Sequence, residues 1–560
     1  MSRFYRKSLL VVLALFLSIG MVSPTQAESK AEGGGYWVPK DMVEKVTELM
    51  EEGKPIGDLG IKQDQLQKTE GIQPLNELMK EDQQSKTTYR VNLAPPIKTA
   101  EGEWAPPAFD YDHIQTTDEC QRHPESSSET GYIKNRYSFC WSHVATYQVP
   151  VKCIGPICDY EGVQFQFTEI GYGSNQSRKM RVFYTIEDIQ VTDPALNGAK
   201  LKIDMVCESK LNVGDCQEDP DYPATERTIA QWKNTNYSTE IFTSEAPEAN
   251  ADNPDKIGYM EFWPKLTFTH KARKFEESID GIKQKVRFDS ANYMFVFPDQ
   301  YYWQGAVFSN ATPIFNVPIT KPEFEMLKEA GEHWKFAMDH PEQTKPEMIG
   351  KQIPGGVGDN TLTRMYSKRH QTEYNRNRSK TSRVCAREFA NEDRTGKQCD
   401  EFPFASTWQG SSTNGSDNFS IRLISADSNE AAGRWLGAWY AYDRVLDGDP
   451  FQVEVEAPEK IATIRSEGQP QEDQDHRSSD NFSIQNIPSY ATKLQWKVID
   501  GPTNVQFDVM KDISFDVDPT ILNDLQSESE TDVVTGDNLY IANPENTNGE
   551  SFTVEVYAIP

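Results

Sequence analysis

The most regular patterning in the chain lies in residues 101–320. Segments such as YEGVQFQFTEI, KMRVFYTIEDIQV and GYMEFWPKLTFTH mix aromatic and β-branched residues in partial alternation with polar ones, and Gly, Pro, Asn and Asp separate them. Strand-like alternation broken by turn residues is typical of an antiparallel sandwich or barrel. The pattern therefore predicts an antiparallel β domain over residues 101–320, and similar segments predict a small β domain over residues 486–560.

Two other stretches have a helical period. Residues 39–52 predict an amphipathic helix, because apolar residues recur there at spacings of three and four; they are Val43, Val46, Leu49 and Met50. Residues 321–338 predict a second helix with several aromatic side chains. The rest of residues 28–100 is polar and predicts a linker or pro-segment, and the acidic stretch 457–485 predicts a linker.

The first 27 residues predict a secretory signal. Arg3, Arg6 and Lys7 precede an apolar run over residues 9–19, and small residues at Thr25 and Ala27 suit a cleavage site. An uncleaved membrane anchor is the alternative, but the apolar run is short for spanning about 30 Å of hydrocarbon. We therefore expect a secreted, extracellular protein.

The eight cysteines fall into four near pairs, which suits an exported chain. Exported proteins keep disulfides, and short-range bridges are the simplest pairing of these spacings. A zinc site is the alternative, although zinc ligands usually come in two C-x₂₋₄-C sets. The predicted bridges are Cys120–Cys140, Cys153–Cys158, Cys207–Cys216 and Cys385–Cys399.

The charge of the chain argues against general binding to nucleic acids. Removing the three positive charges of the signal takes the formal net charge from −29 to −32. Such a polyanion repels DNA unless a local patch reverses the sign. Residues 361–400 supply that patch, because they contain ten Lys or Arg and five acids. Arg376 and Arg378 in this patch are predicted to bind phosphate.

Residues 397–410 read KQCDEFPFASTWQG and carry the candidate chemistry. Pro403 disfavours a helical Phe402 and itself suits the first turn of a helix, so we expect Asp400 and Glu401 at the mouth of a helix. Neighbouring side chains of an extended segment point apart. We therefore expect one acid to bind a metal ion or water directly, and the other to be held by an arginine or by backbone N–H groups.

Residues 421–437 read IRLISADSNEAAGRWLG and form a second motif. An apolar strand leads into a polar loop with Ser425 and Asn429, and small residues then begin a helix. Such an arrangement presents hydroxyl, amide and backbone N–H groups to an anion. We predict Ser425 as a substrate-binding residue.

Together the two motifs resemble the NucA/NucB family of secreted bacterial deoxyribonucleases. Residues 399–407 match the family's C-D-E-(aromatic)-P-F-A-S-T run, and residues 429–437 match its N-x-x-A-G-x-W-x-G segment. The resemblance covers about residues 345–456 and implies an α+β nuclease domain, which would follow the disulfide-stapled β region and precede the small C-terminal β domain. One departure is Glu430, which stands where compact members have arginine or glutamine.

The resemblance implies a divalent-metal-dependent, non-specific endonuclease acting on DNA. Asp400 and Glu401 would be the catalytic and metal-binding pair, with Mg²⁺ or Mn²⁺, and Asn429 a supporting active-site residue. His370 is a further candidate, as a general base. The alternative is a non-enzymatic extracellular protein that binds a glycan or protein through its β regions and carries a degenerate nuclease-like domain.

Overall fold

The fold is taken from a computed structural model of the chain. The structure describes residues 33–61, 71–91, 111–154, 157–212, 216–296, 300–358, 360–412 and 417–457, with short strands at 97–98 and 104–105 and further strands between residues 459 and 559. The predicted signal, residues 1–27, lies outside the described residues. Among the described helices, none has the length and apolar character needed to cross a membrane.

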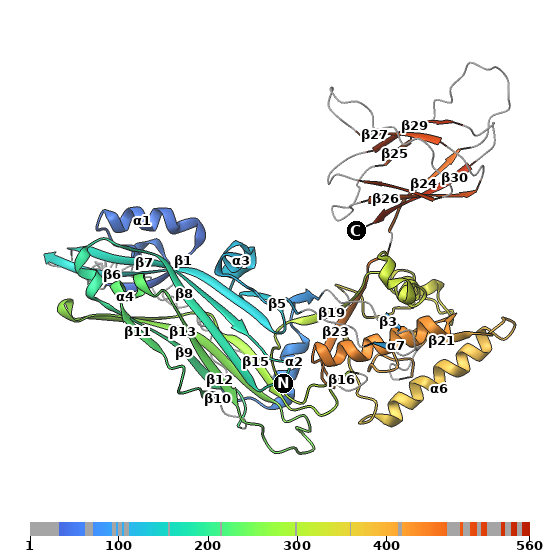
Figure 1. The fold of residues 1–560 in the computed structure, drawn as a ribbon, viewed down its shortest axis with the longest axis horizontal. Coiled ribbons are helices and arrows are strands. Elements are labelled where there is room, and N and C mark those ends of the chain that lie inside the picture. Colours follow the sequence, from blue (N-terminus) through green and yellow to red (C-terminus); the bar gives the residue numbers. More distant parts are fainter. Residues whose placement is uncertain are drawn as a thin grey trace, which may run out of the picture.

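Two antiparallel sheets form the largest part of the molecule (Figure 1). The first has the order β1-β6-β7-β8-β12-β10, with β5 beside β6, and the second has the order β11-β9-β13-β15-β18, with β14 beside β13. The antiparallel strands predicted in residues 101–320 are confirmed. The strands of the first sheet are β1 (Gly34–Val38), β5 (Tyr132–Asn135), β6 (Ser138–Ile154), β7 (Ile157–Tyr172), β8 (Lys179–Val191), β10 (Cys216–Glu218) and β12 (Tyr237–Ser244). Those of the second are β9 (Lys200–Ser209), β11 (Thr225–Thr228), β13 (Gly258–His270), β14 (Phe275–Asp280), β15 (Gln284–Asp289) and β18 (Gly305–Phe308).

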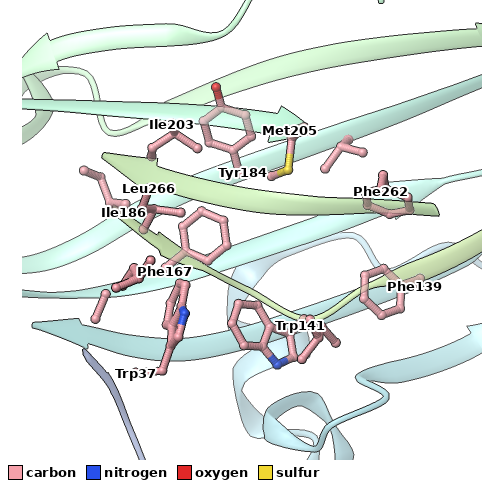
Figure 2. Packing of buried hydrophobic residues seen from close by; sticks show 14 of the residues in the cluster. Trp37, Phe139, Trp141, Phe167, Tyr184, Ile186, Ile203, Met205, Phe262 and Leu266 are labelled. Carbon is pink, nitrogen blue, oxygen red and sulfur yellow. The ribbon is translucent and has the colours of Figure 1, made fainter. Parts of the chain in front are cut away.

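Aromatic side chains fill the space between the two sheets. Trp37 and Trp141 meet edge to face with ring centroids 4.7 Å apart, and Phe167 and Phe262 belong to the same buried cluster (Figure 2). Trp37 comes from β1, which pairs with β6 although it lies outside the predicted β domain. The sandwich therefore includes a strand from the stretch that the sequence predicted as a linker or pro-segment.

The helix predicted in residues 39–52 is confirmed as a short 3₁₀ turn followed by α1 (Val43–Glu51). Val46 and Met50 are buried, and α1 packs against β7. A second short helix, α2 (Leu75–Gln83), places Leu78 in a buried cluster with Leu446. Residues 28–100 thus contribute helices that pack on the rest of the molecule.

A second unit carries the motif segments. Its mixed sheet has the order β2-β19-β23-β20, and helices α5 and α7 pack on one another and share its core. Phe315, Trp334, Trp435 and Phe451 meet in this core, which therefore draws on residues 312–339 as well as on the predicted domain 345–456. The elements are β2 (Thr88–Arg90), β19 (Thr312–Val317), α5 (Lys328–Asp339), β20 (Leu362–Thr363), α6 (Gln371–Glu388), β21 (Lys397–Phe402), β22 (Ser420–Ser425), α7 (Ala426–Tyr442) and β23 (Pro450–Val455).

All four predicted disulfides are present, and the described residues contain no free cysteine. Three of them staple the sandwich. The fourth, Cys385–Cys399, joins the end of α6 to β21. It therefore ties the helix that bears the basic patch to the strand that bears the acidic pair.

A group of buried charges, which we call the junction cluster, joins the sandwich to the second unit. It consists of Arg136, Arg287, Asp289, Arg444 and Asp449, all at most 2% exposed. Arg136 and Arg287 donate to Asp449 at 3.0 and 2.6 Å, and Arg444 Nε donates to Asp289 at 2.9 Å. Burial acts to raise the pKa of Asp449, but the charges of Arg287 and Arg136 outweigh it and hold that pKa below its usual value.

Beyond residue 458 the described strands pair in antiparallel fashion, in the orders β24-β30-β26-β28 and β25-β29-β27. The strand β24 (Glu459–Ser466) lies in the stretch that was predicted as an acidic linker. The linker prediction is wrong for these residues, because the backbone of β24 pairs with β30. The other strands are β25 (Phe482–Ile484), β26 (Lys493–Asp500), β27 (Gln506–Lys511), β28 (Glu528–Asp532), β29 (Leu539–Glu545) and β30 (Phe552–Ile559).

Candidate active site

A cavity of about 770 Å³ opens between α6, β21 and α7 in the second unit. Asp400 and Glu401 line it together with Asn429 from α7 and Arg378 from α6. Tyr374, Phe404 and Tyr440 add aromatic surface. The cavity therefore brings the two sequence motifs and the basic patch to one place.

The acidic pair does not lie at the mouth of a helix. Asp400 and Glu401 are in β21, which pairs with β22 in a two-stranded antiparallel ladder, and turns follow Pro403. The expected helix start is wrong because Phe402 still pairs with Ser420 as the last residue of the strand. The expectation that neighbouring side chains diverge holds, since the two carboxylates bond to different helices.

Asp400 is held from α5. Its Oδ2 atom lies 2.7 Å from His333 Nδ1 and accepts a hydrogen bond of 2.9 Å from the indole N–H of Trp334. The other ring nitrogen of His333 lies 2.8 Å from the hydroxyl of Ser420, which fixes the plane of the imidazole. Asp400 is thus oriented by a histidine and a tryptophan, where we expected an arginine or backbone N–H groups.

Glu401 is held from α6. The hydroxyl of Thr381 donates to its Oε2 atom, and Thr381 also bonds to Ser411 at 3.2 Å. Burial raises the pKa of Glu401 to about 7, against the lowering effects of the Thr381 hydrogen bond and of the charge on Arg378. A carboxyl group that exchanges a proton near neutral pH is suited to general acid–base chemistry.

The other predicted residues divide into those inside and outside the cavity. Asn429 lies inside and donates to Gln398 Oε1 at 2.8 Å. Ser425 caps α7, its hydroxyl accepting from the backbone N–H of Ser428, and is not part of the cavity wall. His370 precedes α6 and lies 2.9 Å from Asp447, also outside the cavity wall. Arg376 lines a separate depression on the outer side of α6.

Sequence reasoning missed three residues that hold the acidic pair: His333, Trp334 and Thr381. Trp334 has the appearance of an ordinary core aromatic in the sequence, and the His-Trp pair lies more than sixty residues before the acid that it contacts. Thr381 carried no signal in the sequence, and its role follows from its position on the buried face of α6, where it bonds to Glu401 and Ser411. Thr381 follows Asn377 by four residues, so both side chains lie on the buried face of α6.

Oxygen ligands in the cavity fit a small hard cation. Among the described residues, no group of three or more His, Cys, Asp or Glu side chains is placed to hold a metal ion. Mg²⁺ does not require such a cage, because it keeps several waters and binds through one or two carboxylates together with substrate phosphates. Asp400 and Glu401 both line the cavity, so either carboxylate can contribute to that type of ligand set.

The fold and cavity define an α+β domain with a carboxylate pair facing a basic helix. Residues 352–454 match the family model described as Deoxyribonuclease NucA/NucB, so the chain carries a NucA/NucB deoxyribonuclease domain within a larger multidomain protein. No curated protein matches the chain. The family and the four disulfides together indicate a nuclease that works outside the cell.

Proposed function

We propose that the protein is a secreted, divalent-metal-dependent, non-specific endonuclease that hydrolyses phosphodiester bonds of DNA. The observation that carries the proposal is Glu401, a buried carboxylate that lines a cavity beside a basic helix and has a pKa of about 7. Its neighbour Asp400 lines the same cavity and is fixed in orientation by two side chains.

Asp400 and Glu401 are the residues that would hold Mg²⁺ or Mn²⁺. When bound, such an ion polarises the scissile phosphate and lowers the pKa of an attacking water. Glu401 is also our choice for the group that accepts a proton when Asp400 alone holds the ion, because burial then leaves the pKa of Glu401 at about 7.

Cationic and polar side chains would position the substrate. Arg378 faces the cavity from α6, where its guanidinium offsets the charge of the phosphate. Asn429 and Gln398 bond to each other on the facing wall and offer an amide pair to a phosphate or sugar oxygen. Ser425 and His370 have other partners, and we assign them structural roles at the starts of α7 and α6.

Export by the predicted signal completes the proposal, with the nuclease unit built from residues 312–339 as well as from the predicted domain 345–456. The decisive experiment is cleavage of plasmid DNA by the full secreted chain with Mg²⁺, with Mn²⁺ and with EDTA. We expect nicking with either ion and none with EDTA. If the folded chain cuts nothing with any divalent metal, the function as a nuclease is refuted, and a binding protein with a degenerate nuclease domain takes its place.

A further inference from the structure

The outer side of α6 has a depression of its own, separate from the cavity that holds the acidic pair. Its volume is about 930 Å³, and its walls come from α6 and from Ser412. Arg376, Lys380 and Arg383 give it a cationic surface. Arg378 belongs to both the depression and the cavity, and thus links them around the helix.

The cations of α6 differ in their partners. Lys380 pairs with Asp417 at 2.9 Å, and Arg387 pairs with Glu388 at 2.8 Å. Within the parts of the chain that the structure describes, no carboxylate lies within 4 Å of the guanidinium groups of Arg376, Arg378 or Arg383. In a chain with 86 acids and 57 basic residues, such unpaired arginines favour an anionic partner from outside.

The spacing of these cations suits a chain of phosphates. Arg376, Lys380 and Arg383 follow one another at intervals of four and three residues, which places them about 6 and 4.5 Å apart along the helix axis. They therefore form a row along one side of α6. A row of cations at this spacing can contact successive phosphates of a repeating anion.

We propose that the outer face of α6 binds the sugar–phosphate backbone of the DNA strand beyond the bond that is cut. The inference rests on the proposed nuclease function and extends it: the enzyme gains affinity and rate from substrate length. Continuity through Arg378 favours this occupant over other polyanions, because a strand bound in the cavity reaches the row of cations without leaving the protein surface.

The test compares an outer-face variant, Arg376→Ala with Arg383→Ala, with a control, Arg122→Ala, which removes an exposed cation that lies outside α6 and is paired with Asp118. Binding to long duplex DNA is measured by fluorescence anisotropy over a range of salt, in the full chain carrying Glu401→Gln so that no cleavage occurs. Each lost phosphate contact lowers the slope of log K against log salt by about 0.9, so the outer-face variant should lower it by about 1.8. The control should leave the slope unchanged.

Cleavage is then measured with Glu401 intact, on long DNA and on bis(p-nitrophenyl) phosphate, which is too small to reach the outer face. The outer-face variant should lose rate on long DNA by a larger factor than on the small diester. The charge-retaining variant Arg376→Lys with Arg383→Lys should recover most of the salt slope, which separates loss of charge from loss of fold.

Three results overturn the inference. They are an unchanged salt slope, an equal loss of rate on both substrates, and a loss of binding to heparin without any loss on DNA, which would assign the surface to another polyanion. Failure of the proposed function looks different: the parent chain then cleaves neither substrate, while anisotropy still reports whether the outer face binds DNA.

Discussion

Two buried carboxylates, Glu401 in the cavity and Asp449 in the junction cluster, show opposite electrostatic behaviour at similar burial. Glu401 is 7% exposed and Asp449 is 2% exposed. Burial raises the pKa of Glu401 to about 7, whereas the guanidinium groups of Arg287 and Arg136 overcome the effect of burial at Asp449 and hold its pKa below the usual value. The difference lies in the partners.

The comparison separates an acid that holds structure from an acid that is available for chemistry. Asp449 has both oxygens bonded to arginines that no ligand can reach. Glu401 bonds to a neutral hydroxyl and lies beside open volume. Burial with full charge compensation gives a stable ion cluster, while burial with neutral donors leaves a proton-exchanging group.

Replacement of Glu401 should have the largest effect on activity. Glu401→Gln keeps the size of the side chain and the bond to Thr381, but it removes the negative charge. Loss of a general base costs about 10²–10⁴-fold in rate, so plasmid cleavage should fall by at least that factor while the melting temperature changes little. Glu430→Gln, an acid-to-amide change on the exposed wall of the same cavity, is the control and should keep activity. Cleavage by folded Glu401→Gln at the parent rate would assign the acidic pair a structural role.

Replacement of Asp449 should have the largest effect on stability. Asp449→Asn removes the carboxylate to which Arg136 and Arg287 both bond directly, and breaking such a buried pair costs about 3–5 kcal/mol in the free energy of unfolding. Urea denaturation followed by tryptophan fluorescence measures it. Glu454→Gln is the matched control, because the pair of Glu454 with Arg90 is half-exposed and should contribute less than about 1 kcal/mol. If both variants lower the free energy of unfolding by the same amount, the junction cluster contributes no more to stability than the half-exposed pair of Glu454 with Arg90.

Glu240 resembles Glu401 in having a neutral hydroxyl as a partner, but it lies in the sandwich and is 1% exposed. It accepts from Tyr184 at 3.0 Å and from the backbone N–H of Met205 at 3.1 Å, and burial raises its pKa from 4.5 to about 7. The folded state therefore binds a proton more tightly than the unfolded state. The stability from this group is fully present below pH 4.5 and is lost as the pH rises to about 7, by up to about 3 kcal/mol.

The measurement is thermal unfolding of the parent and of Glu240→Gln across this pH window. The stability of the parent relative to the variant should decline with rising pH, since glutamine does not titrate. A difference that stays constant across the window would mean that Glu240 is not protonated in the folded protein.

Replacement of Trp334 should have the smallest effect. Trp334→Phe removes the indole N–H that orients Asp400 but keeps an aromatic ring in the core. Loss of one hydrogen bond to a charged group costs about 1.5 kcal/mol, which corresponds to roughly a tenfold slower cleavage if the orientation of Asp400 matters. Trp435→Phe is the control, because the indole N–H of Trp435 is buried without a hydrogen-bond partner among the described residues. Similar cleavage rates for the two variants would show that the hydrogen bond from Trp334 to Asp400 does not contribute to catalysis.

Local patterns predicted much of the fold. The helix after residue 39, the antiparallel strands of residues 101–320 and the four disulfides follow from periodicity and from the spacing of cysteines, which are properties of neighbouring residues. The strand that bears Asp400 was mistaken for a helix mouth because Pro403 alone cannot reveal that Phe402 pairs with Ser420. Strand pairing depends on partners elsewhere in the chain.

The candidate site was predictable only in its centre. The motifs located Asp400, Glu401 and Asn429, because the chemistry requires those residue types in a short span. Position in space, by contrast, decided that His370 and Ser425 lie outside the cavity and that His333 and Trp334 support it. Such contacts join segments far apart in sequence, so no local pattern reports them.

The junction cluster has a consequence for the portability of the catalytic unit. Asp449 and Arg444 fall inside the span that matches the nuclease family, but Arg136, Arg287 and Asp289 come from the sandwich. A graft of residues 352–454 onto another protein would carry away one acid and one arginine and leave their counterions behind. In this molecule the nuclease segment is thus no interchangeable cassette, and its sequence and that of the sandwich are constrained to change together.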